Sequence, residues 1–276
     1  MGKHSRLIGQ DIFLSTYESR FNEKGYLEVS YEGKSIWILN ALPYEEIKVH
    51  IYTKKKRHLL GYATEIHTSS PHRQEPRDSH FMATAPWEIM DDEEELALKN
   101  HLLRETYSFE HPSLSEHEQN IIQQAGIRQP HHIWEYRNKV EFSFYMDEHD
   151  TMQLSFNMRG SYKKKLPVHH FSLLPPAMNE QAQRIVKHLN DKGFSKQQCK
   201  YLMLQYSFTD GQVIAGIYLQ EHIPEPAELR TLLNDTLIGI GVYFTPPETP
   251  AAIAQETIAE HGTFTLHEEI NGRHFS

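Results

Sequence analysis

Apolar and polar residues alternate in five successive segments between residues 7 and 68, and this pattern restricts the possible folds more than any other feature. The segments are DIFLSTY, GYLEVSYEG, KSIWILNAL, IKVHIYTKKK and LLGYATEIHT, separated by Gly, Asn and Pro. A period of two residues is typical of strands that bury one face. Several short strands at close spacing predict a small β-barrel or sandwich over residues 1–68.

The remainder of the chain mixes helical and strand patterns. Residues 69–86 contain three prolines and little periodicity, which indicates a linker, and residues 69–130 are interpreted as this linker followed by a helical segment. Helices are expected near residues 87–109, 115–125, 177–192 and 224–233. The strand patterns after residue 131 predict an α+β domain over residues 131–276 with a mainly antiparallel sheet.

Two basic segments accompany strands in the second half. In WEYRNKVEFSF, the residues Arg137, Asn138 and Lys139 stand where an alternating strand begins. In SFNMRGSYKKK, a short strand runs into a basic turn that contains a glycine. An ordinary β-hairpin with solvated charges explains both segments without any function.

A third basic run, Lys54-Lys55-Lys56-Arg57, lies in a predicted hairpin tip. Four adjacent cations can contact successive phosphates and release their counterions. Charged hairpin tips are also simply solvated, and the two interpretations are equally favoured by the residues alone.

Composition excludes several classes of site. The net charge is −9 and the pI is about 6.1, so any contact with a polyanion must come from local basic patches. The single cysteine, Cys199, excludes an intrachain disulfide and a multi-thiolate metal site, and no zinc-binding histidine spacing occurs. The chain has no apolar run of membrane-spanning length, which predicts a cytoplasmic protein with no membrane partner.

Several segments carry a resemblance in a fixed order: WILNALPYEEIKVHIYTKKK, HRQEPRDSHF followed by PWE, WEYRNKVEFSF, FNMRGSYKKK, LLPPAMNE and GTFTLHEEINGRHFS. Together they resemble the N-terminal portion of the RNA (uracil-5-)-methyltransferases, which methylate uridine in rRNA or tRNA. Members of that family have a TRAM β-barrel, which is OB-like, then a central α/β RNA-binding domain and a C-terminal domain that binds S-adenosylmethionine. The resemblance implies a TRAM barrel over residues 1–68 and the central RNA-binding domain over residues 131–276.

The chain departs from the family pattern at several points. Tyr44 replaces a usual glycine, and Asp78 stands at the first of four positions where many members hold an iron–sulfur cluster on cysteines. We therefore expect no iron–sulfur cluster, with Trp87 and Pro86 packed in its place. The sequence stops at Ser276, before the family's methyltransferase domain, which is expected to be missing together with the S-adenosylmethionine site.

No catalytic residue is expected among those present. In the family a cysteine thiolate attacks uridine C6 before C5 is methylated. Cys199 lacks the family's Asn-Pro-Pro-Arg setting and is expected to be a buried structural residue. The chain is therefore expected to be inactive alone and to hold no cofactor.

What remains is RNA capture. Arg137 and Lys139 are expected to contact phosphates, and Asn138 a base or ribose. Tyr136 and Tyr162 are candidates for base stacking, although packing is the more common role of such residues. The full predicted RNA-binding set is Tyr136, Arg137, Asn138, Lys139, Arg159, Tyr162, Lys163, Lys164, Lys165, Lys54, Lys55, Lys56 and Arg57.

Three hypotheses follow. The chain is the RNA-recognition portion of an S-adenosylmethionine-dependent RNA uridine C5-methyltransferase, cut short before a fused methyltransferase domain. Alternatively, it is a free-standing RNA-binding protein that descends from that family and carries out no catalysis itself, with a separate methyltransferase as its catalytic partner. The third hypothesis is a scaffold that binds another protein, rather than RNA, through its acidic surface.

Overall fold

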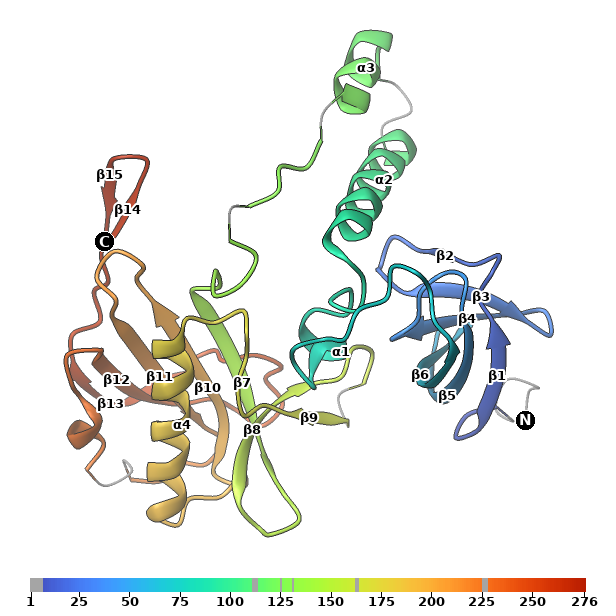
Figure 1. Ribbon diagram of the computed structural model, residues 1–276. Coiled ribbons are helices and arrows are strands. Elements are labelled where there is room, and N and C mark those ends of the chain that lie inside the picture. Colours follow the sequence, from blue (N-terminus) through green and yellow to red (C-terminus); the bar gives the residue numbers. More distant parts are fainter. Residues whose placement is uncertain (1–6, 111–113, 125, 131, 162–163, 225–227) are drawn as a thin grey trace. The chain divides into compact units, whose positions relative to one another are not determined.

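The computed structural model describes residues 7–110, 114–124, 126–130, 132–161, 164–224 and 228–276 (Figure 1). The chain divides into two compact units. Unit 1 comprises Met1–His131 and Met158–Lys163, and unit 2 comprises His132–Asn157 and Lys164–Ser276. The division places one short segment of the second half of the chain, Met158–Lys163, with the first half.

Unit 1 is built on a six-stranded sheet with the order β1-β5-β6-β4-β3-β2, in which only β4 and β6 run parallel. The strands are β1 (Asp11–Ser15), β2 (Arg20–Phe21), β3 (Leu27–Tyr31), β4 (Lys34–Leu39), β5 (Glu46–Lys55) and β6 (His58–Thr68). Three register shifts interrupt the β5–β6 pairing. Such irregularities increase the twist and bending of a strand. The alternating apolar side chains of these strands form one buried core.

In the turn between β4 and β5, the sequence indicates the position of the proline but not the backbone conformation of the residue that follows it. Pro43 is well suited to the second position of the turn. The following residue, Tyr44, has a φ of +67°, in the left-handed region that glycine adopts without strain. Its ring is exposed and meets Tyr17 edge-on, with the ring centroids 5.9 Å apart.

The segment expected to be a linker, residues 69–86, is packed into unit 1. It contains α1 (Phe81–Thr84), and an isolated bridge pairs Arg73 with Met90. Phe81 lies in a second small core with Ile89 and Met90, and Trp87 packs at its edge. The Trp87 indole N–H also donates to the Gly25 carbonyl over 3.1 Å. The prolines of residues 69–86 therefore mark an irregular backbone that is packed against the rest of unit 1.

Two helices follow in unit 1. Helix α2 (Asp92–Glu110) begins later than expected because the Asp91 carboxylate accepts the Glu94 backbone N–H over 2.8 Å and so caps the helix. Helix α3 (Glu116–Gln124) begins with a capping box. In it Ser115 and Glu118 exchange side-chain to backbone hydrogen bonds.

Unit 2 is a seven-stranded sheet with the order β13-β12-β11-β10-β7-β8-β9, and only β11 and β12 run parallel. The strands are β7 (Lys139–Met146), β8 (Met152–Asn157), β9 (Lys165–Pro167), β10 (Cys199–Tyr206), β11 (Val213–Leu219), β12 (Leu237–Phe244) and β13 (Glu256–Gly262). This confirms the α+β class with a mainly antiparallel sheet. A separate hairpin, β14 (Glu268–Ile270) and β15 (Arg273–Phe275), closes the chain.

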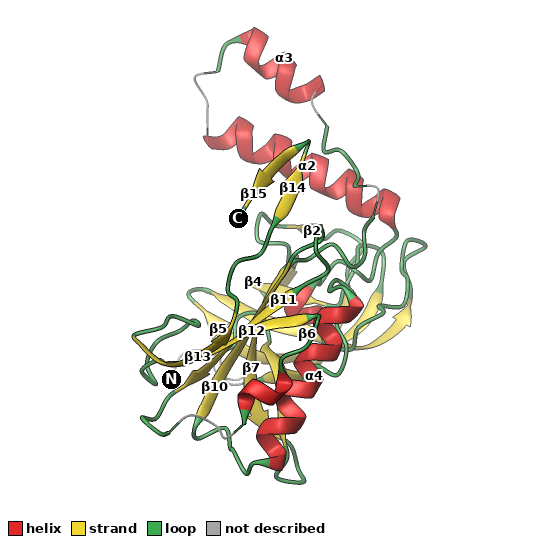
Figure 2. Ribbon diagram, turned by 90° about the vertical axis from the view of Figure 1, so that its left-hand side faces the viewer, coloured by secondary structure: helices red, strands yellow, loops and turns green. Residues whose placement is uncertain are grey.

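Helix α4 (Pro176–Asp191) lies against β8, β10 and β11 (Figure 2). The helix was expected near residues 177–192, and its buried side chains include Met178, Ile185 and Leu189. Gly193, with a φ of +75°, follows the helix end. The helix expected near residues 224–233 is reduced to a short 3-10 helix, η2 (Leu229–Leu232), and residues 225–227 lie outside the described residues.

Candidate functional site

The basic hairpin tip between β5 and β6 is fully exposed. Lys54 and Lys55 end β5, and Lys56 takes a left-handed turn conformation with a φ of +55°. Lys54, Lys55, Lys56 and Arg57 all have exposed side chains, as a phosphate-binding tip requires. The next residue, His58, turns inward and stacks on Trp37, with the ring centroids 4.1 Å apart.

Aromatic rings next to this tip are covered by cations. Trp37 stacks on Tyr26 on another side, with centroids 5.6 Å apart. The Lys24 ammonium lies 5.0 Å from the Trp37 ring centroid, and the Arg159 guanidinium lies 5.2 Å from that of Tyr26. Each cation–ring contact is worth about 0.5–1 kcal/mol at an exposed site. The rings therefore hold two further cations beside the tip.

Arg159 reaches this place because the turn after β8 belongs to unit 1. Its guanidinium donates to the Lys24 carbonyl over 3.0 Å, and its own carbonyl accepts the Tyr52 hydroxyl over 2.7 Å. The following Gly160 has a φ of +76°, and a Cβ added there would lie 2.5 Å from Leu60 Cδ2. Only glycine fits this close approach. Burial raises the pKa of the Tyr52 hydroxyl, so it remains a donor.

We call Lys24, Arg159 and the tip residues Lys54–Arg57 the cationic patch. Of these, the sequence analysis singled out Arg159 and the tip, and it missed Lys24. It also missed the supporting rings Tyr26, Trp37, Tyr52 and His58. No local pattern marks these residues, since Lys24 and Arg159 are separated by 135 positions.

In unit 2 the predicted residues Tyr136–Lys139 lie immediately before β7 and at its first position. Tyr136 is 52% exposed, and the side chains of Asn138 and Lys139 are also exposed. Arg137 is half-buried: its guanidinium lies 5.6 Å from the Phe171 ring centroid, and its backbone N–H donates to Leu173. Arg137 is therefore fixed by packing, whereas Tyr136, Asn138 and Lys139 point their polar groups to solvent.

The lysines of the second basic turn are less available than their sequence implies. Lys165, in β9, is half-buried, and burial with the nearby Lys196 lowers the pKa of its ammonium. Lys164 is also half-buried. Tyr162 and Lys163 lie outside the described residues, so their expected roles stay predictions.

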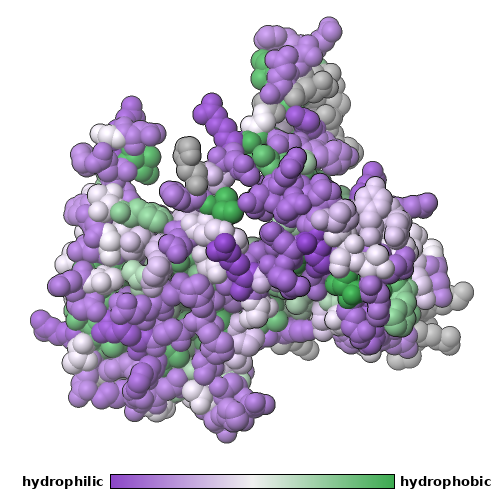
Figure 3. Space-filling view, viewed as in Figure 1, coloured by the Kyte–Doolittle hydropathy of each residue, from purple (hydrophilic) through white to green (hydrophobic). Residues whose placement is uncertain are grey.

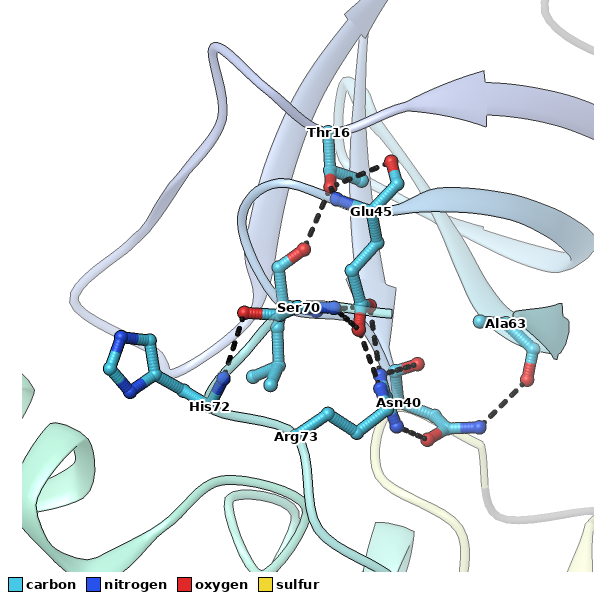
Figure 4. A network of polar contacts seen from close by, with 8 residues as sticks. Thr16, Asn40, Glu45, Ala63, Ser70, His72 and Arg73 are labelled. Atoms are coloured by element: carbon cyan, nitrogen blue, oxygen red, sulfur yellow. Dashed lines mark hydrogen bonds and ion pairs between the residues drawn. The ribbon is translucent and has the colours of Figure 1, made fainter. Parts of the chain in front are cut away.

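A second polar cluster of unit 1 is directed inward and is not a binding site (Figure 4). Glu45 is fully buried. Its carboxylate accepts two hydrogen bonds from the Arg73 guanidinium and one each from the backbone N–H groups of Leu42 and Ser70. Arg73 also donates to the side chain and carbonyl of Asn40. These groups satisfy one another. The network fastens residues 69–74 to the sheet.

Cys199 is buried, as the sequence predicted. Its side chain is 1% exposed, and burial raises the pKa of the thiol to about 12. A thiol with such a pKa is not a nucleophile at neutral pH. Among the described residues, no group of three or more His, Cys, Asp or Glu side chains could hold a metal ion. No helix in the described ranges is long and apolar enough to cross a membrane.

The exposed surface is largely hydrophilic. Figure 3 shows polar side chains over most of the face in view, with hydrophobic residues in small groups. The exposed large hydrophobic side chains include Phe13, Tyr136 and Phe208. The cationic patch is one place on the described surface where charges and aromatic rings combine.

Comparison with known proteins finds similarity to RNA methyltransferases. The chain is 27% identical over 153 residues to the 23S rRNA (uracil(1939)-C(5))-methyltransferase RlmD of Histophilus somni, an alignment that covers 54% of this chain and 33% of the relative. An uncharacterized RNA methyltransferase of Lactiplantibacillus plantarum is 26% identical over 164 residues, covering 56% of this chain and 34% of the relative. The chain is related to the RNA uracil-5 methyltransferases.

A solved structure agrees in fold. The tRNA (uracil-54, C5)-methyltransferase of Pyrococcus abyssi, solved in complex with S-adenosyl-L-homocysteine, matches with a TM-score of 0.68 and 13% identity. The match covers 93% of this chain and 57% of the other. No family model matches the sequence. The matched region spans about a third of the length of the curated relatives.

Proposed function

We propose that this chain performs RNA recognition for uridine C5 methylation of rRNA or tRNA. The observation that supports this most is the cationic patch, in which Arg159 and Lys24 meet beside the exposed tip Lys54–Arg57. Names of the relatives point in the same direction, because they are RNA methyltransferases. The TRAM and central-domain assignments of units 1 and 2 belong to this proposal.

The patch would bind the RNA backbone. Each Lys or Arg that neutralises a phosphate releases counterions, which contributes affinity without sequence preference. The exposed Tyr136, Asn138 and Lys139 in unit 2 offer a ring, an amide and an ammonium for contacts to an unpaired nucleotide. Cys199 is the chain's one cysteine and is buried. We therefore assign the chain to substrate capture and not to attack on uridine.

The test is salt-dependent binding of a single-stranded oligoribonucleotide, followed by fluorescence anisotropy. The test variant changes Lys55, Lys56 and Arg57 to Gln. The control variant changes three exposed cations outside the patch, Lys187, Arg230 and Arg273, to Gln. Both variants lose three positive charges, so they separate a local from a global effect. We expect the slope of log affinity against log salt to fall by about 2 in the test variant only, since each phosphate contact contributes about 0.7.

Equal weakening by both variants would show that net charge, and not the patch, governs binding. No RNA binding by the parent protein would overturn the proposal. That result would favour the scaffold hypothesis, in which the chain, whose net charge is −9, contacts another protein through its acidic surface.

A further inference from the structure

The face of the unit 2 sheet opposite α4 carries a row of tyrosines beside a row of glycines. Tyr201, Tyr218 and Tyr243 are register partners across β10, β11 and β12. Two positions away, Gly216 and Gly241 are partners in the next row. Because alternate residues of a strand share a face, the rings stand next to a stretch of backbone without side chains.

The Tyr243 ring lies across these glycines. A Cβ added at Gly241 would lie 2.3 Å from the Tyr243 hydroxyl oxygen, and one added at Gly216 would lie 3.2 Å from Tyr243 Cε2. The Tyr243 hydroxyl donates to the Glu260 carboxylate over 2.8 Å, which fixes the ring. Tyr243 is half-buried, so part of this residue remains accessible to solvent.

Residues 246–252, which are part of the connection between β12 and β13, lie beside Lys200 and Tyr201. We call these residues the strap. The Lys200 ammonium donates to the carbonyls of Pro246, Pro247 and Thr249, each within 2.8 Å. The Tyr201 hydroxyl also donates to Thr249, over 3.3 Å. The Tyr218 and Tyr243 rings contact each other, and Tyr218 is only 4% exposed. Tyr243 is therefore the more accessible ring of the two.

Charges around the glycine row favour a base over a phosphate. Glu141 and Glu260 lie in the same register row as the glycines, on either side of them. Their carboxylates repel phosphate and accept hydrogen bonds from the N–H groups of a base. Lys139 lies on the same face, two residues before Glu141, and its exposed ammonium can neutralise the phosphate of that nucleotide.

We infer that Tyr243, resting on Gly216 and Gly241, is a stacking site for one unpaired RNA base. The inference rests on the proposed function, and it deepens that function by assigning base contact to unit 2 and backbone contact to the cationic patch of unit 1. Stacking on an aromatic side chain tolerates any base because each base has a π-face.

The experiment uses the full chain and a single-stranded oligoribonucleotide that contains one fluorescent adenine analogue, whose emission is quenched by stacking. We compare Tyr243→Leu, Tyr243→Phe and the control Tyr107→Leu, which removes an exposed tyrosine from α2. We expect Tyr243→Leu to bind about 10-fold more weakly and to lose the quenching, in line with the loss of one stacked base. Tyr243→Phe and Tyr107→Leu should retain both.

A second measurement needs no substitution. Photo-crosslinking of a thiouridine-containing oligoribonucleotide to the unaltered chain should label the peptide that carries Tyr243, as mapped by mass spectrometry. If the parent binds RNA with the expected salt dependence but Tyr243→Leu leaves affinity and quenching unchanged, or the crosslinks fall elsewhere, the stacking site is overturned and the proposed function stands. If the parent binds no RNA, both fail.

Discussion

The two units use polar groups in opposite ways. Unit 1 buries a charged network of Glu45 and Arg73, whereas Lys24 and Arg159 of the cationic patch lie over aromatic rings. Unit 2 buries an apolar core beneath α4 and keeps aromatic rings and carboxylates on the opposite face of its sheet. In unit 1 the Glu45–Arg73 pair fastens an irregular segment to the sheet, whereas in unit 2 the apolar side chains of α4 cover one face of the sheet.

This difference also separates two kinds of recognition. The cationic patch offers point charges, which bind phosphates without reading sequence. The open face of unit 2 offers a ring and acceptors, which bind a base. In the proposed function, each of these two surfaces would contact a different part of a nucleotide.

The largest expected effect tests the apolar core of unit 2. Phe142 is 1% exposed and packs against Phe156, with centroids 5.2 Å apart. Phe142→Ala should lower the free energy of unfolding by about 4 kcal/mol through lost transfer energy and a cavity. Urea unfolding followed by circular dichroism measures this, with Phe13→Ala, at a residue 67% exposed, as the control. A loss for Phe142→Ala no larger than that of the control would show that the core is not the main support.

The next effect tests the buried charge of unit 1. Glu45→Ala should lower the free energy of unfolding by about 3 kcal/mol, because Arg73 loses its partner and two backbone N–H groups lose their acceptor. Trp37 and Trp87 lie in unit 1 and Trp134 lies in unit 2, so tryptophan fluorescence in a Trp134→Phe background follows the transition of unit 1. Glu65→Gln, which removes an exposed carboxylate paired with Lys48, should leave the midpoint unchanged.

A smaller effect distinguishes paired from unpaired buried carboxylates. Glu88 is 7% exposed; one oxygen accepts the Arg77 backbone N–H, and the other has no hydrogen-bond partner among the described residues. Burial raises the pKa of Glu88 above its usual 4.5. A carboxyl with a raised folded-state pKa contributes stability below pH 4.5 that is lost as pH rises through the folded pKa.

Glu88→Gln should therefore gain stability relative to the parent, on the order of 1 kcal/mol, as pH rises from 4.5 to about 7. Unfolding curves at several pH values measure the difference. Glu65→Gln provides the control, because the exposed Glu65 carboxylate should contribute little to stability at any pH. A constant difference between Glu88→Gln and the parent at all pH values would contradict the assignment.

The smallest effect concerns the turn of unit 1. Tyr44→Gly should raise the free energy of unfolding by about 0.5–1 kcal/mol, because glycine relieves the left-handed conformation at the expense of a contact with Tyr17. Thermal unfolding measures the change. Tyr44→Ala removes the same ring but keeps the strain, so it should be less stable than Tyr44→Gly. If the two variants were equal, backbone strain would be unimportant here.

Periodicity predicted most elements of both units. The strands of the first 68 residues, the helix near residue 115 and α4 all depend on neighbouring residues, which the sequence displays directly. The packing of residues 69–86 was not predicted. Its contacts, such as that of Trp87 with Gly25, join residues far apart in the chain and follow no period.

The candidate site divides in the same way. The sequence by itself determined the exposed basic tip Lys54–Arg57 and the inert, buried Cys199, because charge density and the absence of a catalytic setting are local properties. Only the tertiary structure decided that Arg159 joins Lys24 in unit 1 and that Tyr243 rests on Gly216 and Gly241. These arrangements depend on long-range packing and on strand register, which fix where side chains meet and which no single segment encodes.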